Sequence, residues 1–209
     1  MALEIVRLVL GPMENNTYLL ADSGQAVVVD PSFDSELVLE IVEKHGWDLA
    51  AIWLTHAHFD HIAGVQVIQQ ATGKATLPVG LHTADLPLWQ QGGGAGLFGM
   101  NIAPGPDPSI HFEHGQIITL GESLLEVRHA PGHTPGHVMF YAAEAGAMLV
   151  GDVIFYHGIG RTDLPGGSQA VLMQSIREQV LTLPVQTRLL SGHGPETTIE
   201  EELAGNPYL

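Results

Sequence analysis

Cysteine is absent from this 209-residue chain, and basic side chains are scarce. Without a thiol, the protein forms neither a disulfide nor a thiolate metal site. Seven Lys and Arg against 23 Asp and Glu give a formal charge of -16, which argues against a nucleic-acid partner because a phosphate backbone needs basic contacts. Arg7 interrupts the apolar N-terminal run, and no apolar stretch reaches the roughly 20 residues of a membrane span. We therefore expect a cytoplasmic protein without a nucleic-acid or membrane partner.

The apolar content suits one packed domain spanning residues 1–209. Hydrophobic residues make up 45% of the chain and charged residues 14%, which is ample for a folded core at this length. Apolar runs predict strands at residues 5–10, 17–21, 26–29, 49–54, 117–120, 123–129, 138–142, 148–150 and 187–190. Helical spacing of apolar residues predicts helices at 34–45, 60–72 and 171–180. No linker divides these elements into separate domains, and nothing in them indicates an oligomeric state.

Glycine and proline mark the helix ends and one long loop. Ser32 or Asp34 is expected to cap the first helix, and Gly46 and Gly73 are expected to end the first and second helices. Residues 89–109 are rich in both residue types, and we interpret them either as a lid or as a surface insertion without function. Three apolar side chains are candidates for the lid, although ordinary core packing is the stronger expectation for them: Trp89, Phe98 and Met100.

The stretch 55–61 reads Thr-His-Ala-His-Phe-Asp-His and holds four candidate metal ligands, namely His56, His58, Asp60 and His61. It directly follows the apolar run 49–54, and open α/β sheets place their chemistry where strands end. Imidazole and carboxylate groups are the ligands that divalent transition metals take from a protein at neutral pH. The alternative is a polar loop that contains histidines by coincidence, which this density of ligands disfavours.

Three further candidates each follow a predicted strand in the same way. His133 lies in a turn rich in glycine and proline, Asp152 follows residues 148–150, and His193 lies between two glycines. A lone His or Asp in such a turn is more often structural. Their joint placement beside the first motif nevertheless predicts a single metal centre.

Seven ligands suit two metal ions, because one zinc ion takes four ligands and a catalytic one takes three plus water. Three ligands would bind each ion and one carboxylate would bridge them: His56, His58 and His133 on one side, Asp60, His61 and His193 on the other, and Asp152 between. Asp60 and Asp152 are the candidate catalytic residues. Paired ions can hold a shared hydroxide as the nucleophile. Zinc is the first expectation, although iron and manganese accept the same ligands.

Other side chains near these motifs are candidates for supporting roles. Asp30 either orients a ligand histidine or forms a turn. Arg161 and Asp163 are expected to pair and to fix their loop, in preference to contacting a substrate. Packing or capping is expected for His137, and His157 stays outside the predicted ligand set although it could face the pocket.

The motifs together resemble those of the metallo-β-lactamase-fold hydrolases. The resemblance rests on the stretch 55–61, on Pro-Gly-His-Thr-Pro-Gly at 131–136, on Gly-Asp at 151–152 and on Gly-His-Gly-Pro at 192–195. Their order and spacing match across nearly the whole chain. The resemblance implies an α/β fold of four layers, an αββα sandwich with the metals at one edge of the two sheets.

Within that superfamily the chain looks most like the glyoxalase II branch, and more narrowly like its short bacterial members. Residues 16–18, 160–168 and 201–209 carry this similarity. It implies hydrolysis of a small-molecule acyl thioester, glutathione-derived as in S-D-lactoylglutathione. Full-length glyoxalase II enzymes also carry a C-terminal helical extension with basic and aromatic glutathione-binding residues. This chain lacks that extension and has few basic residues to replace it, so the resemblance implies the chemistry more firmly than the substrate.

Persulfide dioxygenases resemble the chain in the same motifs and imply a different reaction. Their single iron would be bound here by His56, His133 and Asp152, a facial triad with open positions, whereas the Gly-His-Gly-Pro form around His193 favours a hydrolase. A β-lactamase is disfavoured by the lack of an export signal, and a nuclease by the acidic charge. A non-catalytic metal-binding or scaffold protein is the remaining alternative, and a complete set of seven ligands disfavours it.

Overall fold

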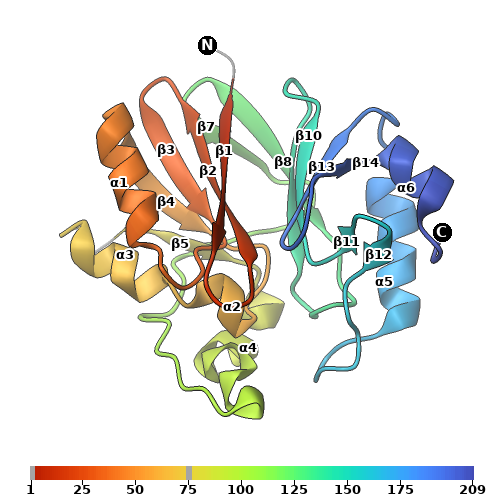
Figure 1. The fold of residues 1–209 in the computed structure, drawn as a ribbon, viewed down its shortest axis with the longest axis horizontal. Helices are drawn as coiled ribbons and strands as arrows, with labels where there is room; N and C mark the ends of the chain where they lie inside the picture. The colour runs from red at the N-terminus through yellow and green to blue at the C-terminus, as the bar shows by residue number, and fades with distance from the viewer. Residues whose placement is uncertain (1–2, 74–76) are drawn as a thin grey trace.

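Two β-sheets packed face to face form the centre of the protein, with helices on both outer surfaces (Figure 1). The computed structural model describes residues 3–73 and 77–209. A buried apolar cluster fills the space between the sheets, and each sheet packs a second cluster against its own helices. The αββα arrangement expected from the resemblance is therefore confirmed.

The first sheet has the order β1-β2-β3-β4-β5-β6. Its strands are β1 (Glu4–Leu10), β2 (Asn15–Asp22), β3 (Gln25–Val29), β4 (Asp48–Trp53), β5 (Val79–Leu81) and β6 (Ile110–His111). The first three strands pair antiparallel and the rest pair parallel. All eight residues of β2 are buried, because alternate side chains face opposite layers. Leu19 contacts the helix-side cluster, while Tyr18 and Leu20 contact the cluster between the sheets.

The second sheet has the order β14-β13-β10-β9-β8-β7. Its strands are β7 (Ile117–Leu120), β8 (Ser123–His129), β9 (Val138–Ala142), β10 (Ala147–Gly151), β13 (Arg188–Ser191) and β14 (Thr197–Thr198). A small hairpin of β11 (Ile154–Phe155) and β12 (Gly158–Ile159) follows β10. Every strand predicted from the sequence is confirmed, and no end differs from its predicted position by more than two residues.

Helices cover the two outer faces. The first sheet carries α1 (Glu36–His45), α3 (Val65–Ala71) and α4 (Leu86–Gln90), and the second carries α5 (Gln169–Ser175) and α6 (Ile199–Gly205) (Figure 1). The π-helical turn η3 (Ile176–Val180) extends α5 over the rest of the predicted range. Within the described residues, no helix is long and apolar enough to cross a membrane.

The helix predicted at 60–72 is wrong in one respect, because two helices occupy this range. The short helix α2 (Phe59–Ile62) ends before Gly64, and α3 begins after it. The Gly64 amide donates to the carbonyl of Pro31 at 2.9 Å, outside the helix. A Cβ on Gly64 would lie 2.1 Å from Ser35 Oγ, so this contact requires glycine.

The predicted cap of α1 is also wrong, whereas the predicted helix ends are confirmed. The capping position is Ser35, whose hydroxyl donates to the Ser32 carbonyl and makes no cap bond. Gly46 ends α1 in the left-handed region, with φ of 66°, and Gly73, with φ of 61°, follows α3.

The segment 89–109 has more structure than a loop. It contains the end of α4 and the 3₁₀ segment η2 (Gly92–Phe98), preceded by the 3₁₀ turn η1 (Thr83–Asp85). Trp89 is 1% exposed and belongs to the core, so the core packing expected for it is confirmed. Phe98, by contrast, is 43% exposed and lines a cavity that is described below.

Candidate metal centre

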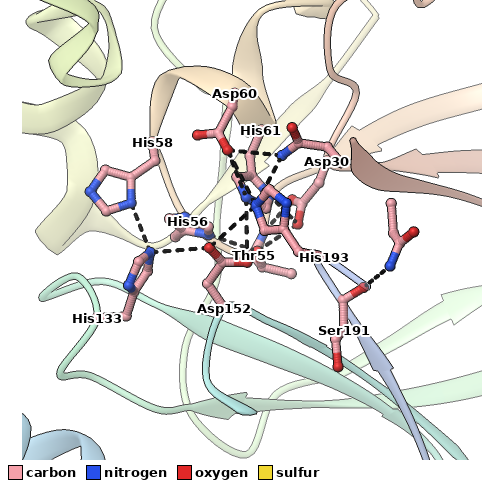
Figure 2. A network of polar contacts seen from close by, with 12 residues as sticks. Asp30, Thr55, His56, His58, Asp60, His61, His133, Asp152, Ser191 and His193 are labelled. Carbon is pink, nitrogen blue, oxygen red and sulfur yellow. Dashed lines mark hydrogen bonds and ion pairs between the residues drawn. The ribbon is translucent and has the colours of Figure 1, made fainter. Parts of the chain in front are cut away.

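The seven predicted ligands meet in one place, at the edge where the strands of both sheets deliver their loops (Figures 1 and 2). The segment after β4 and the adjoining α2 supply four of them, and the ends of β8, β10 and β13 supply the others. This convergence joins residues that are more than 100 positions apart in the chain. The parallel pairing of β3 with β4 and of β10 with β13 places those strand ends at the same edge.

One group of ligand atoms consists of three buried imidazoles. The side chains of His56, His58 and His133 offer nitrogens that all lie within 4.8 Å of one another. His58 Nδ1 lies 2.8 Å from His133 Nε2. Burial lowers the pKa of all three rings, that of His58 to about 3, and neutral imidazole is the form that binds a metal.

The second group contains a carboxylate and two imidazoles: Asp60, His61 and His193. Asp60 Oδ2 lies 3.7 Å from His61 Nε2 and 3.3 Å from His193 Nε2. Burial opposes charge on His61, but the carboxylates of Asp152 and Asp60 outweigh it and raise the pKa of this ring. The carboxylates therefore make this group of ligand atoms favourable for a positive charge.

Asp152 lies between the two groups (Figure 2). Its Oδ1 is 3.5 Å from His61 Nε2, and its Oδ2 is 3.5 Å from His133 Nε2 and 3.7 Å from His193 Nε2. Burial opposes ionisation of this carboxyl, but the neighbouring histidines, His61 first, hold its pKa well below the usual range. One carboxylate is thus within reach of ligands from both groups.

The residues present fit a divalent metal. Among the described side chains of the seven predicted ligands, three buried atoms lack a hydrogen-bond partner: His56 Nε2, His61 Nε2 and Asp152 Oδ1. Unpaired buried polar atoms are costly, and a cation would satisfy all three. A set of nitrogen and carboxylate donors without sulfur suits zinc, iron or manganese.

Asp30 carries out both of the roles considered for it. Its backbone adopts a φ of 51° after β3, and its carboxylate accepts from the Thr55 amide at 2.7 Å and from the Thr55 hydroxyl at 2.6 Å. The same carboxylate lies 3.1 Å from His61 Nδ1. It therefore fixes the turn and orients the ring of a predicted ligand, as carboxylates behind metal-binding histidines do.

Asp85 was not identified from the sequence, although it connects two ligand-bearing loops. This buried residue ends η1. Its Oδ2 accepts from the Ala57 amide at 3.0 Å and from the Thr134 hydroxyl at 2.8 Å, and its Oδ1 accepts from the Gly136 amide at 2.6 Å. The carboxylate thus joins the loop of His56 and His58 to the loop of His133. An isolated aspartate in a helical segment gives no signal of such a role.

Two further residues hold the ligands in place. Asn15 Nδ2 donates to Asp60 Oδ2 at 3.0 Å, and a β-bridge joins Asn15 to His193. His137 Nε2 accepts from the Asp152 amide at 3.0 Å, and its ring stacks on that of His56. Packing was expected for His137, whereas Asn15 was missed because a single amide at a strand start carries no pattern.

The remaining candidates lie away from the ligand atoms. Arg161 and Asp163 form the expected ion pair, with contacts of 2.8 and 2.7 Å, and both are largely exposed. The Arg161 carbonyl, not its side chain, reaches the site by accepting from His133 Nδ1 at 2.7 Å. His157 is exposed in the turn of the β11–β12 hairpin and does not line the cavity of the site.

A cavity of about 420 Å³ opens onto the ligands. Half of its described lining residues are apolar, namely Met13, Phe59, Phe98, Phe155, Ile159 and Leu164. Arg161 is the basic side chain among its described lining residues. The site therefore combines predicted metal ligands with a cavity that suits a small, largely apolar molecule.

Curated proteins have sequences similar to this chain over nearly its whole length. The chain is 38% identical to the probable metallo-hydrolase YqgX of Bacillus subtilis, over 97% of this chain and 96% of the relative. It is 33% identical to the hydroxyacylglutathione hydrolase GloC of Haemophilus influenzae, over 94% and 92%. Both curated relatives therefore align along nearly their whole length.

Solved structures give the same result. The crystal structure of the BLEG-1 B3 metallo-beta-lactamase matches with a TM-score of 0.91 and 36% identity, covering 99% of both chains. That of TTHA1623 in a di-iron-bound form matches with a TM-score of 0.89 and 38% identity, covering 98% of this chain and 100% of the other. Residues 10–193 match the metallo-beta-lactamase superfamily, and the chain belongs to that superfamily.

Proposed function

We propose that this protein is a dinuclear metal-dependent hydrolase of acyl thioesters, with residues 1–209 acting as one catalytic unit. The observation that carries the proposal is the position of Asp152 between two three-residue ligand groups in one cavity. Two zinc ions would be held by the seven predicted ligands, and iron or manganese would suit the same donors. When bound, such ions supply Lewis acidity and make a hydroxide nucleophile available near neutral pH.

The protein's own groups favour a thioester over an amide. Asp60 and Asp152 bind a metal only as carboxylates, so neither is available to protonate a leaving group. A thiol has a pKa of about 8.5, so its thiolate is a weak base that can leave without being protonated. The new C–O bond forms, and sulfur takes the electron pair of the C–S bond that breaks. An amine would need a proton at that moment. We expect the Asp60 carboxylate, held by Asn15, to orient the attacking water by accepting its hydrogen bond.

The relatives support this substrate class without identifying the acyl group. GloC of Haemophilus influenzae bears the name of a hydroxyacylglutathione hydrolase, which makes a glutathione-derived thioester the first substrate to test. The cavity offers glutathione one basic side chain, and Arg161 already pairs with Asp163. Glutathione recognition would therefore be weak relative to recognition of the reacting carbonyl.

Elemental analysis followed by a substrate panel on the same sample tests the proposal. We expect close to two metal ions per chain and release of free thiol from S-D-lactoylglutathione. His58→Ala should lose one ion and most of this activity, typically more than 100-fold. His111→Ala, in which an exposed histidine of β6 is removed, is the matched control and should retain both.

Two other outcomes would contradict the proposal. Oxygen uptake with glutathione persulfide, together with one iron per chain and no thioester turnover, would indicate the dioxygenase alternative at His56, His133 and Asp152. Tight metal binding without turnover of any thioester, ester or β-lactam would indicate a non-catalytic protein.

A β-lactam is the second substrate class, because BLEG-1, described as a B3 metallo-beta-lactamase, is 36% identical over 99% of the chain. The same metal-loaded sample should be assayed with a chromogenic cephalosporin. Turnover of the cephalosporin with a higher kcat/KM than any thioester would replace the thioesterase proposal by this one.

A further inference from the structure

A second cavity of about 260 Å³ adjoins the cavity of the metal centre. Three residues line both spaces, namely His58, Phe98 and Leu164. The remaining walls come from α4, from η2 and from the loop after β12, and they consist of Leu88, Gln91, Gly93, Gly94, Gly96, Leu97 and Pro165. The second cavity is therefore a side chamber of the candidate site, and it shares the predicted metal ligand His58 with the first cavity.

The wall formed by η2 is fixed to the segment that carries the ligands. Gly93 has a φ of 64°, and a Cβ there would lie 2.4 Å from the Phe59 amide nitrogen and 2.7 Å from the Ala57 carbonyl oxygen. The rings of Phe98 and Phe59 also pack at 5.2 Å between centroids. This close packing holds the chamber at a constant distance from His58.

The chamber is apolar and open. Among its described lining residues none has a carboxylate, ammonium or guanidinium group. Leu97 is 65% exposed and Phe98 is 43% exposed, so large apolar side chains at its rim remain in contact with water. An apolar ligand that covered them would release this water and bind through the hydrophobic effect.

We infer that the side chamber binds the acyl chain of the substrate and makes the enzyme selective for apolar acyl groups longer than acetyl. This inference rests on the thioesterase function proposed above, since it places the reacting carbonyl at the metal centre. The acyl chain, and not the thiol part of the substrate, occupies the chamber. A thiol such as glutathione carries carboxylates, which a chamber without basic side chains cannot neutralise. A lactoyl group, short and hydroxylated, would leave the chamber unfilled.

Hydrolysis of a series of glutathione thioesters by the metal-loaded enzyme tests the inference. With acetyl, butyryl, hexanoyl and octanoyl esters of the same thiol, kcat/KM should rise about threefold to fourfold per methylene until the chamber is full. Leu97→Ala should reduce this increment. Leu203→Ala on α6, also a half-exposed leucine at 53% exposure, is the matched control and should leave the whole series unchanged.

Binding of the product acids gives a second measurement that does not depend on turnover. Octanoate should bind the metal-loaded protein more tightly than lactate in calorimetry, and Leu97→Ala should narrow the difference. Hydrolysis of every thioester at one rate, with equal binding of both acids, would overturn the inference and leave the thioesterase function intact. Failure to hydrolyse any thioester would instead overturn the thioesterase function and the inference with it.

Discussion

A single buried carboxylate, that of Asp85, connects two loops of the candidate metal centre. Asp85 accepts three hydrogen bonds from two loops that are distant from it in the chain. Ala57 in one loop lies 28 residues away, and Thr134 and Gly136 in the other lie 49 and 51 residues away. Burial raises the pKa of this carboxyl, and the hydrogen bonds from those donors offset the effect only in part. The close approach depends on Gly136, where a Cβ would lie 2.6 Å from the Asp85 amide nitrogen.

Asp85→Asn should weaken metal binding as well as stability. The amide group keeps one acceptor and turns an NH₂ toward a donor, so at least one bond is lost, at a cost of about 1–3 kcal/mol in the free energy of unfolding. Looser packing of the His58 and His133 loops should also lower metal affinity about 10-fold or more. Urea unfolding of the metal-free protein and metal titration measure the two effects.

Asp107→Asn is the matched control, since this carboxylate accepts one exposed hydrogen bond, from Gln90. Equal stability and equal metal affinity of the two variants would show that Asp85 does not organise the site. A loss of stability alone, with unchanged affinity, would limit Asp85 to a structural role.

The candidate ligands could be picked out from the sequence, whereas the residues that contact them could not. His56, His58 and His61 follow an apolar strand at close spacing, a pattern that local chemistry explains. Asn15 and Asp85 act through contacts between distant segments, and single polar residues give no periodic signal. Their roles appear only when the fold brings those segments together.

Among the elements, η2 shows most clearly what periodicity cannot predict. Its glycines indicated a loop of weak order, yet Gly93 and Gly94 adopt positive φ values of 64° and 75° inside a 3₁₀ segment. Glycine is required at position 93 by the close contact with Phe59. At position 94 it is required by the backbone angle alone, because a Cβ there would lie 3.7 Å from its nearest neighbour atom. Composition reveals glycine content but not which glycine meets another backbone.

Gly93→Ala should separate η2 from the ligand-bearing segment. Gly99 provides the matched control, with a similar φ of 70° and open space around its Cβ position. Gly99→Ala should lower the free energy of unfolding by about 1–2 kcal/mol through backbone strain, and Gly93→Ala by a further ~1–3 kcal/mol through overlap. Chemical denaturation measures the difference, and equal losses would refute the contact.

The sequence patterns could not predict that the two sheets pack face to face. The apolar runs predicted the strand positions, but the αββα layering came from the family resemblance. Buried strands are similar in composition whichever of the two sheets they belong to, so composition cannot assign a strand to a sheet. Side chains from β2 make the connection in the structure. Tyr18 donates to the Ser191 carbonyl at 2.8 Å, and Asn16 Nδ2 donates to the same carbonyl at 2.8 Å, so the first sheet holds the strand that delivers His193.

Asp22 joins the sheets at the opposite end of β2, and this contact should depend on pH. Its Oδ2 accepts from the hydroxyl of Ser123, the first residue of β8, at 2.8 Å and from the amide of Glu122, in the turn before β8, at 2.9 Å. The Ser123 hydrogen bond is the largest of the causes that lower the pKa of the Asp22 carboxyl. A carboxyl with a lowered pKa in the folded state stabilises the protein above its unfolded pKa of about 3.9, and this stabilisation disappears as the pH falls through the folded value.

Asp22→Asn should therefore lower the Tm at pH 7 more than at pH 3. The asparagine cannot ionise, so the wild-type protein should lose its advantage over the variant as its own carboxyl becomes protonated. Thermal unfolding of both metal-free proteins between pH 3 and pH 7 measures this difference, and Asp34→Asn, at an exposed position before α1, corrects for the change in net charge. A Tm difference that stays constant over this range would mean that the link between the sheets does not depend on the charge of Asp22.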